Sequence, residues 1–177
     1  MLNEARQALV RAIARDIAPR WLGTPWAFHG TSQTPGEGAI ACGYFVSTVL
    51  RDAGLRVERV RLAQQPAERI ILSLTGEAHV RRFSNAPLER FVAAVRSCGE
   101  GAYVVGLDYH VGLLTCGPEG VFFVHSQGVA PREVVRERAG ESPVLDASRY
   151  RVFGRITADD ALIEAWLTGR AIRTRTG

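Results

Sequence analysis

Cys42 is the residue best placed to do chemistry, because it stands where a loop rich in glycine and proline becomes an amphipathic helix. Phe45, Val46 and Val49 fall on one face of that helix, which puts the cysteine in its first turn. Free N–H groups and the positive end of the helix dipole typically lower a cysteine pKa from about 8.5 toward roughly 3.5–7.5. The pattern predicts a thiolate nucleophile, and the alternative is a small buried hydrophobic residue.

Two histidines flank a predicted β-hairpin further along the chain. Its two apolar runs are separated by the turn Gly117–Gly120. If Cys116 pairs with Val121, His125 falls on the same face of the hairpin as His110. One histidine could take a proton from the cysteine while a second polar group holds its ring in place. We therefore expect His110 to be the base and His125 to orient it.

Three further polar residues compete for the orienting role. The same register places Gln127 opposite His110, with a glycine left between the two histidine rings. A slip of one residue would present Ser126 on that face instead. Asp108 lies two residues before His110 and faces the same way on a straight strand. We expect Asp108 and Gln127 to line the substrate site beside the three expected catalytic residues.

Taken together, these segments resemble the NlpC family of papain-like cell-wall cysteine peptidases. The resemblance runs from about residue 21 to residue 127, and it implies a papain-like fold, a cysteine peptidase or amidase activity and no cofactor. It also implies a peptide or murein-like substrate, in which a stem peptide is cut near a D-glutamyl bond. The matching residues are Gly23-Thr24-Pro25-Trp26 and Gly30 in a loop, Cys42-Gly43-Tyr44-Phe45-Val46 in a helix, and His110-Val111-Gly112 and Val124-His125 in the hairpin.

Three departures from the family pattern border the expected site. Ala41 stands where the family usually has aspartate, Tyr44 replaces a small residue, and Trp26 replaces the usual loop tyrosine. The resemblance therefore implies the class of reaction better than it implies the substrate. We expect Trp26 to line the substrate site without offering a hydroxyl group, and Gly43 to allow close approach of the backbone. The backbone N–H of Cys42 is the expected oxyanion donor.

The rest of the chain predicts an α+β domain that positions these segments. Helices come first and an antiparallel sheet follows, which is the papain-like order, with the nucleophile helix packed on the sheet. We expect one domain over residues 1–177, with an N-terminal helix at about 3–18, a core at about 21–156, a C-terminal helix at about 158–168 and a basic tail at 170–177 of a commonly disordered kind. Other expected elements are helices from Pro66 to Leu74 and from Pro87 to a stop at Gly99, strands Ala102–Leu107, His110–Cys116, Val121–Gln127 and Tyr150–Ile156, and a near capping box at Thr157-x-x-Asp160.

Composition excludes several kinds of site. All 22 basic residues are arginine, which excludes a Schiff-base lysine and a phosphate-loop lysine. The net charge is +4, but the arginines are dispersed along the chain, so we expect no nucleic-acid partner. Cys42, Cys98 and Cys116 lack the spacing of metal ligands, so we expect free thiols, no metal and no cofactor.

The N-terminal residues predict an amphipathic helix rather than a signal peptide, and no later stretch reaches membrane-spanning length. We therefore expect no signal peptide, no membrane span and a cytoplasmic location as made. A cell-wall substrate would then require export by a signal-independent route. The sequence contains no indication of the oligomeric state.

Three functions remain open at this stage. The first is a cysteine hydrolase that cleaves amide bonds through an acyl-thioester, with murein stem peptides as the implied substrate. The second is a papain-like hydrolase or acyltransferase that acts on a non-murein cytoplasmic substrate. The third is a catalytically silent binding domain. A Cys42–His110 pair that opens onto a cleft favours the two enzymes, whereas a buried cysteine that faces away favours the silent domain.

Overall fold

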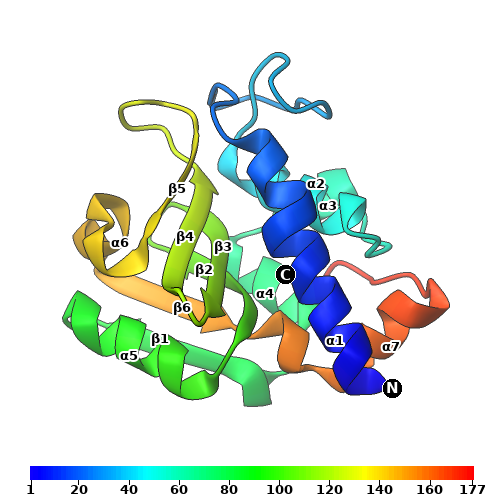
Figure 1. The fold of residues 1–177 in the computed structure, drawn as a ribbon. Coiled ribbons are helices and arrows are strands. Elements are labelled where there is room, and N and C mark those ends of the chain that lie inside the picture. The colour runs from blue at the N-terminus through cyan, green and yellow to red at the C-terminus, as the bar shows by residue number, and fades with distance from the viewer.

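One six-stranded antiparallel sheet organises the chain, as Figure 1 shows. The computed structural model describes residues 1–177 and orders the strands β1-β6-β2-β3-β4-β5. The expected α+β class is confirmed. The strand bounds are Val80–Ser84 for β1, Gly101–Leu107 for β2, Val111–Gly117 for β3, Gly120–Ser126 for β4, Val134–Arg138 for β5 and Tyr150–Gly154 for β6.

The hairpin of β3 and β4 has the predicted register. Cys116 pairs with Val121, and the ladder continues by one further pair, Gly117 with Gly120, so that the connecting turn has two residues. The edge strands β1 and β5 were not predicted, because both are short and rich in charged side chains. Edge strands of this composition lack the apolar alternation that marks a half-buried strand.

Helices cover both faces of the sheet. In Figure 1, α1, α2, α4 and α7 lie on one side, and α5 and α6 lie on the other. The two five-residue helices, α3 and α6, are too short for a periodic pattern and were not predicted. The helix bounds are Leu2–Arg11 for α1, Cys42–Asp52 for α2, Arg59–Ala63 for α3, Ala67–Leu74 for α4, Leu88–Cys98 for α5, Pro143–Ala147 for α6 and Asp160–Thr168 for α7.

The N-terminal helix runs further than expected. After α1 the chain continues as a π-helical segment over Ala12–Ile17 and as a 3₁₀ turn over Ala18–Trp21. Pro19 does not end the helical path, because it stands in the first turn of the 3₁₀ segment, where a missing N–H costs little. Trp21 is thereby brought into the core, where it meets the ring of Phe45 edge-on at 6.5 Å.

The expected cap of α7 is wrong. Thr157 does not cap α7; it is buried, and its hydroxyl oxygen accepts the N–H of Ala102 on β2 at 3.0 Å. Asp159 caps the helix instead, by accepting the N–H of Ala161. In the basic tail, Ile172 pairs with Val57 in a parallel bridge. Partners that are distant in sequence decide both outcomes.

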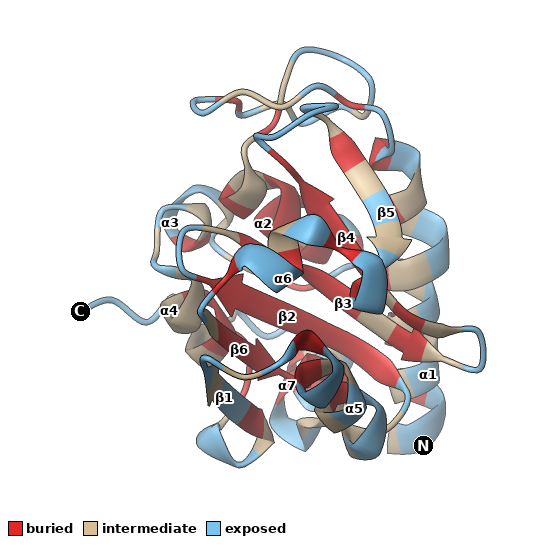
Figure 2. Cartoon of the chain, turned by 90° about the vertical axis from the view of Figure 1, so that its left-hand side faces the viewer, coloured by how far each residue is buried: buried red, intermediate tan, exposed pale blue.

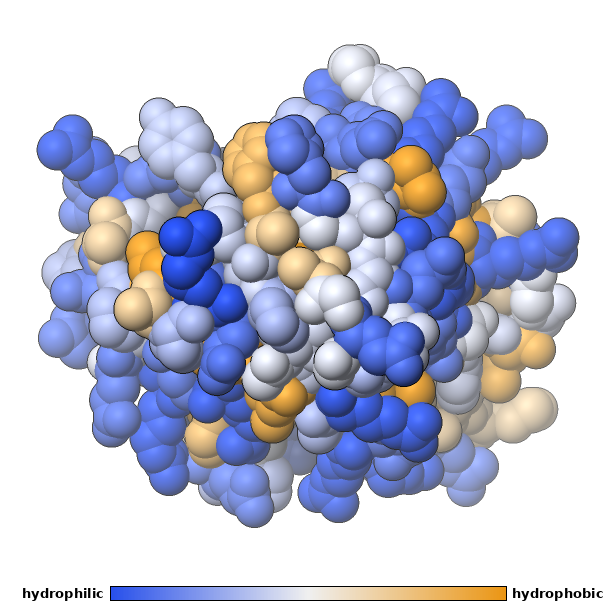
Figure 3. All heavy atoms as spheres, turned by 90° about the horizontal axis from the view of Figure 1, so that it is seen from above, coloured by the Kyte–Doolittle hydropathy of each residue, from blue (hydrophilic) through white to orange (hydrophobic).

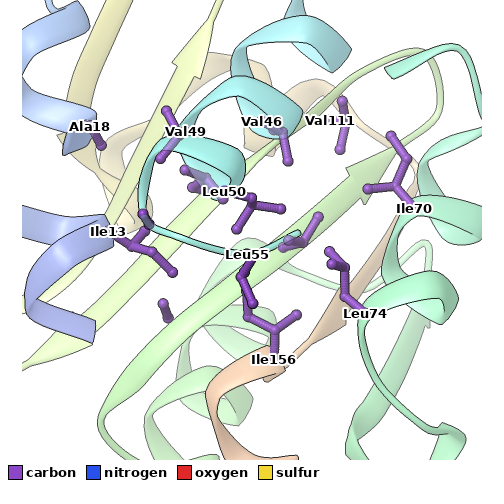
Figure 4. Packing of buried hydrophobic residues seen from close by; sticks show 14 of the residues in the cluster. Ile13, Ala18, Val46, Val49, Leu50, Leu55, Ile70, Leu74, Val111 and Ile156 are labelled. Atoms are coloured by element: carbon purple, nitrogen blue, oxygen red, sulfur yellow. The ribbon is translucent and has the colours of Figure 1, made fainter. Parts of the chain in front are cut away.

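The core explains why α2 sits where it does. Phe45, Val46, Val49 and Leu50 are buried on its sheet-facing side, and Figure 4 shows three of them reaching toward side chains of α4 and the N-terminal helix. The central strands β2, β3 and β4 are almost entirely buried, as Figure 2 shows. None of the helices combines the length and the apolar character needed to cross a membrane.

Candidate functional site

Cys42 is the first residue of α2 and lines a cavity of about 450 Å³ together with His110. Ala41 precedes the helix in an extended conformation and offers no side-chain cap, so N–H groups of the first turn remain free. Gly43 also lines the cavity, as predicted, and its packing requires glycine: a Cβ atom here would collide with the carbonyl oxygen of Ala63. Gly43 thus lets α2 approach α3 closely beside the nucleophile.

The Cys42 thiol does not have the lowered pKa that its helix position predicts. Burial raises the pKa above its ordinary value, and the partial positive charge of the nearby backbone N–H groups of Val111, Gly43 and Cys42 only partly offsets that effect. Removal from water destabilises the thiolate by more free energy than the partial positive charge at the helix end contributes in stabilisation. Cys42 therefore rests as a neutral thiol at neutral pH.

His110 lies just before β3, at the turn from β2, and its ring is held by the second histidine. Its Nε2 lies 2.7 Å from Nδ1 of His125, which confirms the predicted contact between the two rings. Burial, and then the neighbouring His125, lower the pKa of His110 to about 3. No hydrogen bond joins the His110 ring to the Cys42 sulfur in this resting arrangement. Such bonds are commonly long before substrate binds.

The hydrogen-bonded chain continues beyond His125 to a residue that sequence reasoning missed. Nε2 of His125 lies 3.0 Å from Oε1 of Glu137 on β5, and the Ser142 hydroxyl donates to the same oxygen at 2.6 Å. Glu137 pairs with Phe123 across β4 and β5, so its side chain shares the face that carries His125. The sequence could have indicated Glu137 only if β5 had been predicted as a strand paired with β4.

Packing fixes the His125 ring in place. The ring of Phe123 stacks on it with centroids 3.7 Å apart and an interplanar angle of 14°. Gly112 leaves the room that the predicted register required, because a Cβ there would lie 2.9 Å from Cβ of His125 and would collide with the Phe123 ring. The side chain of His125 is fully buried as a result.

Asp108 was predicted to line the substrate site, and the structure gives it a different role. Asp108 lines it, but its carboxylate accepts the backbone N–H groups of Arg149 at 2.9 Å and Tyr150 at 3.2 Å, which ties the β2–β3 turn to β6. Those donors, and a partly opposing effect of burial, leave the pKa of Asp108 below its ordinary value. The contact between His110 and His125 leaves Asp108 without the orienting role that its position allowed.

Trp26 and Gln127 do not line this cavity, contrary to expectation. The side-chain amide of Gln127 donates to the carbonyl of Ala130 at 3.1 Å, within its own loop. Trp26 packs on Gly128 and on the guanidinium of Arg132, 5.0 Å from the ring centroid. The physical reason is backbone pairing between two loops, in which the N–H of Trp26 donates to the Arg132 carbonyl at 2.8 Å.

These two loops, residues 23–41 and 127–133, lie at the end of the molecule that Figure 3 views from above. Hydrophobic side chains form only scattered small groups on that face.

The cavity wall holds other residues that the sequence did not single out. The Tyr150 hydroxyl donates to Glu68 at 2.8 Å, Glu68 also binds Arg82 at 2.6 Å, and Tyr109 is 99% exposed at the rim.

The buried histidines make the stability of the fold sensitive to mild acid. Burial lowers the pKa of both His110 and His125. Below pH 6.5 these two histidines therefore bind protons in the unfolded chain but stay neutral in the folded chain. The free energy of unfolding should therefore fall as the pH drops from 6.5 to 5, by up to about 1.4 kcal/mol per pH unit for each histidine. Urea unfolding at several pH values measures this slope.

A His110→Gln variant should lose about half of that slope, because one of the two titrating rings is gone. His29→Gln is the matched control, since His29 is exposed in a loop. Stability that does not change between pH 6.5 and 5, a range in which carboxylates stay ionised, would contradict the neutral state of the two buried rings.

No group of three or more His, Cys, Asp or Glu side chains is arranged to hold an ion. Cys98 is half-buried and Cys116 is buried, and all three cysteines are free thiols. What the arrangement offers chemically is a thiol and an imidazole on one cavity, with free N–H groups beside the thiol and a hydrogen-bonded chain behind the imidazole.

Comparisons with known proteins found no matching family model, no matching curated protein and no matching solved structure for this chain.

Proposed function

We propose that this chain is a cysteine hydrolase that cleaves amide bonds through an acyl-thioester. One observation carries the proposal: Cys42 and His110 line one cavity, and a second histidine holds the His110 ring at 2.7 Å. Nucleophile, base and orienter are the parts that cysteine hydrolases use. The packing of α2 against β3, next to which His110 stands, also favours the papain-like, NlpC-type arrangement that the sequence resembles.

The neutral resting state of both groups decides how the first step proceeds. As the Cys42 sulfur attacks the amide carbonyl carbon, His110 takes the thiol proton, so that the C–S bond and the imidazolium form together. The negative charge moves to the carbonyl oxygen, where the backbone N–H of Cys42 can stabilise it. His110 then protonates the amine nitrogen, the C–N bond breaks, and the acyl group stays on sulfur as a thioester.

Hydrolysis of the thioester completes the cycle. His110 accepts a proton from water while the water oxygen attacks the thioester carbon. The C–S bond then breaks, the carboxylic acid leaves and His110 returns the proton to sulfur. The low pKa of His110, about 3, favours this rapid return of the proton and disfavours a long-lived thiolate–imidazolium pair. A weakly basic imidazole remains usable because the proton moves only as the new bond forms.

A non-murein amide is the second candidate substrate, and the charge of the cavity favours it. No arginine lines the cavity, although the chain contains 22 basic residues, and its two carboxylates are Asp108 and the Glu68 that pairs with Arg82 outside it. Murein stem peptides carry several carboxylates, which such a wall would repel rather than bind. An uncharged or amine-bearing acyl group suits the lining better.

Intact-protein mass spectrometry after rapid acid quench tests the function. The protein is incubated with purified murein fragments and, separately, with a library of amidated peptides. We expect new amine products together with an acyl adduct that maps to Cys42. Cleavage in one pool alone identifies the substrate class. Absence of both product and adduct in the two pools would overturn the hydrolase and leave a silent binding domain.

A further inference from the structure

The hydrogen-bonded chain behind His110 ends on a short helix on the far side of the sheet. It runs from His110 through His125 and Glu137 to Ser142, with successive separations of 2.7, 3.0 and 2.6 Å. Ser142 is 1% exposed and is the N-cap of α6, where its oxygen also accepts the N–H of Leu145. Every link is therefore made between protein groups, and of these the Glu137 side chain is 25% exposed.

The chemistry of the last carboxylate sets the direction of every hydrogen bond in this chain. Burial would raise the pKa of Glu137, but hydrogen bonds from His125 and Ser142 outweigh it and leave the pKa below its ordinary value. An ionised carboxylate only accepts, so Nε2 of His125 must donate to it. His125 is neutral, because burial lowers its pKa by more than Glu137 raises it.

The other ring nitrogen of His125, Nδ1, fixes the position of the proton on His110. A neutral imidazole with its proton on Nε2 has a lone pair on Nδ1, and that lone pair must accept from Nε2–H of His110. The proton of neutral His110 is therefore on Nε2. Its Nδ1 is left with a free lone pair, which is the form that a base needs.

We propose that Glu137, held by Ser142, is a positioning residue that fixes the tautomer of the base His110 through His125. This inference rests on the proposed function and deepens it, because it names what keeps the base able to accept the Cys42 proton. Without an acceptor at Glu137, His125 could carry its proton on Nδ1 and donate it to Nε2 of His110. The His110 proton would then move to Nδ1 and block the base.

The fold holds Glu137 through both ends of α6. At the first end, Ser142 donates to Glu137. At the other end, the carbonyls of Leu145 and Asp146 accept from the guanidinium of Arg151 at 2.7 and 3.1 Å. Arg151 is 2% exposed and makes all its hydrogen bonds to carbonyl oxygens, with no carboxylate partner. These hydrogen bonds from a buried arginine hold the C-terminal end of α6 in place, and with it the position of Ser142.

Nitrogen NMR of the histidine rings in the wild-type protein tests the assignment directly. Uniformly ¹⁵N-labelled protein at pH 7 should show protonated Nε2 and unprotonated Nδ1 for both His110 and His125. A proton on Nδ1 of His110 in the wild type would overturn the proposal, whatever the protein does to substrates.

Variants then test the role of Glu137. Glu137→Ala should shift His110 toward the Nδ1–H tautomer and slow alkylation of Cys42 by iodoacetamide at pH 7 by about 10- to 100-fold. This is less than the roughly 10⁴-fold effect of altering the residue bonded directly to the base in a serine protease. Glu137→Gln, whose amide oxygen can still accept, should retain more of both signals. Glu141→Gln, one residue before Ser142 and exposed, is the matched control.

Equal alkylation losses in the Gln and Ala variants, with the His110 ring signals unchanged in both, would overturn the tautomer role, because they would show that charge alone matters. Unchanged ring signals and an unchanged alkylation rate in Glu137→Ala would overturn it as well. If Glu137→Ala does not fold, Ser142→Ala replaces it, with a smaller loss in the same direction. A tautomer shift in a protein that cleaves no amide would support the relay and reject the hydrolase, so the two failures can be told apart.

Discussion

Replacing Cys42 with alanine is expected to abolish amide cleavage and the acyl adduct together. In serine hydrolases, removal of the nucleophile costs about 10⁶ in kcat, because no second group can form the covalent intermediate. The same loss is expected here, since Cys42 is the cysteine that lines the cavity with His110. Product formation by mass spectrometry on the pool that the wild type cleaves measures this loss.

Cys98→Ala is the matched control for that variant. Cys98 is half-buried at the end of α5, away from the cavity, and its loss should leave turnover near the wild-type level. Timed iodoacetamide labelling adds a readout that needs no substrate. Cys42 should be the most reactive of the three thiols, because it shares a cavity with the proposed base, His110, which can take the thiol proton as the reagent bonds to sulfur. Faster labelling of Cys98 or Cys116 at neutral pH would reject Cys42 as the nucleophile.

Replacing His110 with alanine is expected to cost several orders of magnitude in kcat and to exceed the effect of His125→Ala. The base transfers the proton in every step, whereas the orienting residue acts only by holding the base. The alkylation rate of Cys42 should fall in parallel, since a neutral thiol with a raised pKa depends on a neighbouring base. Both variants are measured by kcat on the cleaved substrate and by the alkylation rate at pH 7.

Two exposed or partly exposed histidines serve as controls. His29 lies in the loop of residues 23–41 and His79 precedes β1, and neither lines the cavity. His29→Ala and His79→Ala should leave both rates close to those of the wild type. Near-normal turnover in His110→Ala, or complete loss in either control, would show that the base lies elsewhere.

Local patterns in the sequence were enough to predict two parts of the site, the nucleophile helix and the histidine hairpin. The apolar face of residues 45–50 predicted α2 and placed Cys42 at its first turn, as the structure has it. The hairpin register followed from two apolar runs and a short turn, and it brought His125 within 2.7 Å of His110. Alternation along a strand and periodicity along a helix are short-range signals, so they can be read without knowledge of the fold.

The groups that complete the site come from distant parts of the chain and are brought together only by the fold. Glu137 stands on an edge strand without a clear pattern, and only its place beside β4 brings it to His125. Pairing between two loops turned Trp26 and Gln127 away from the cavity that their positions in the sequence suggested. The pKa of Cys42 was misjudged for the same reason. A helix end is visible in the sequence, but the burial that raises the pKa depends on every element packed around the thiol.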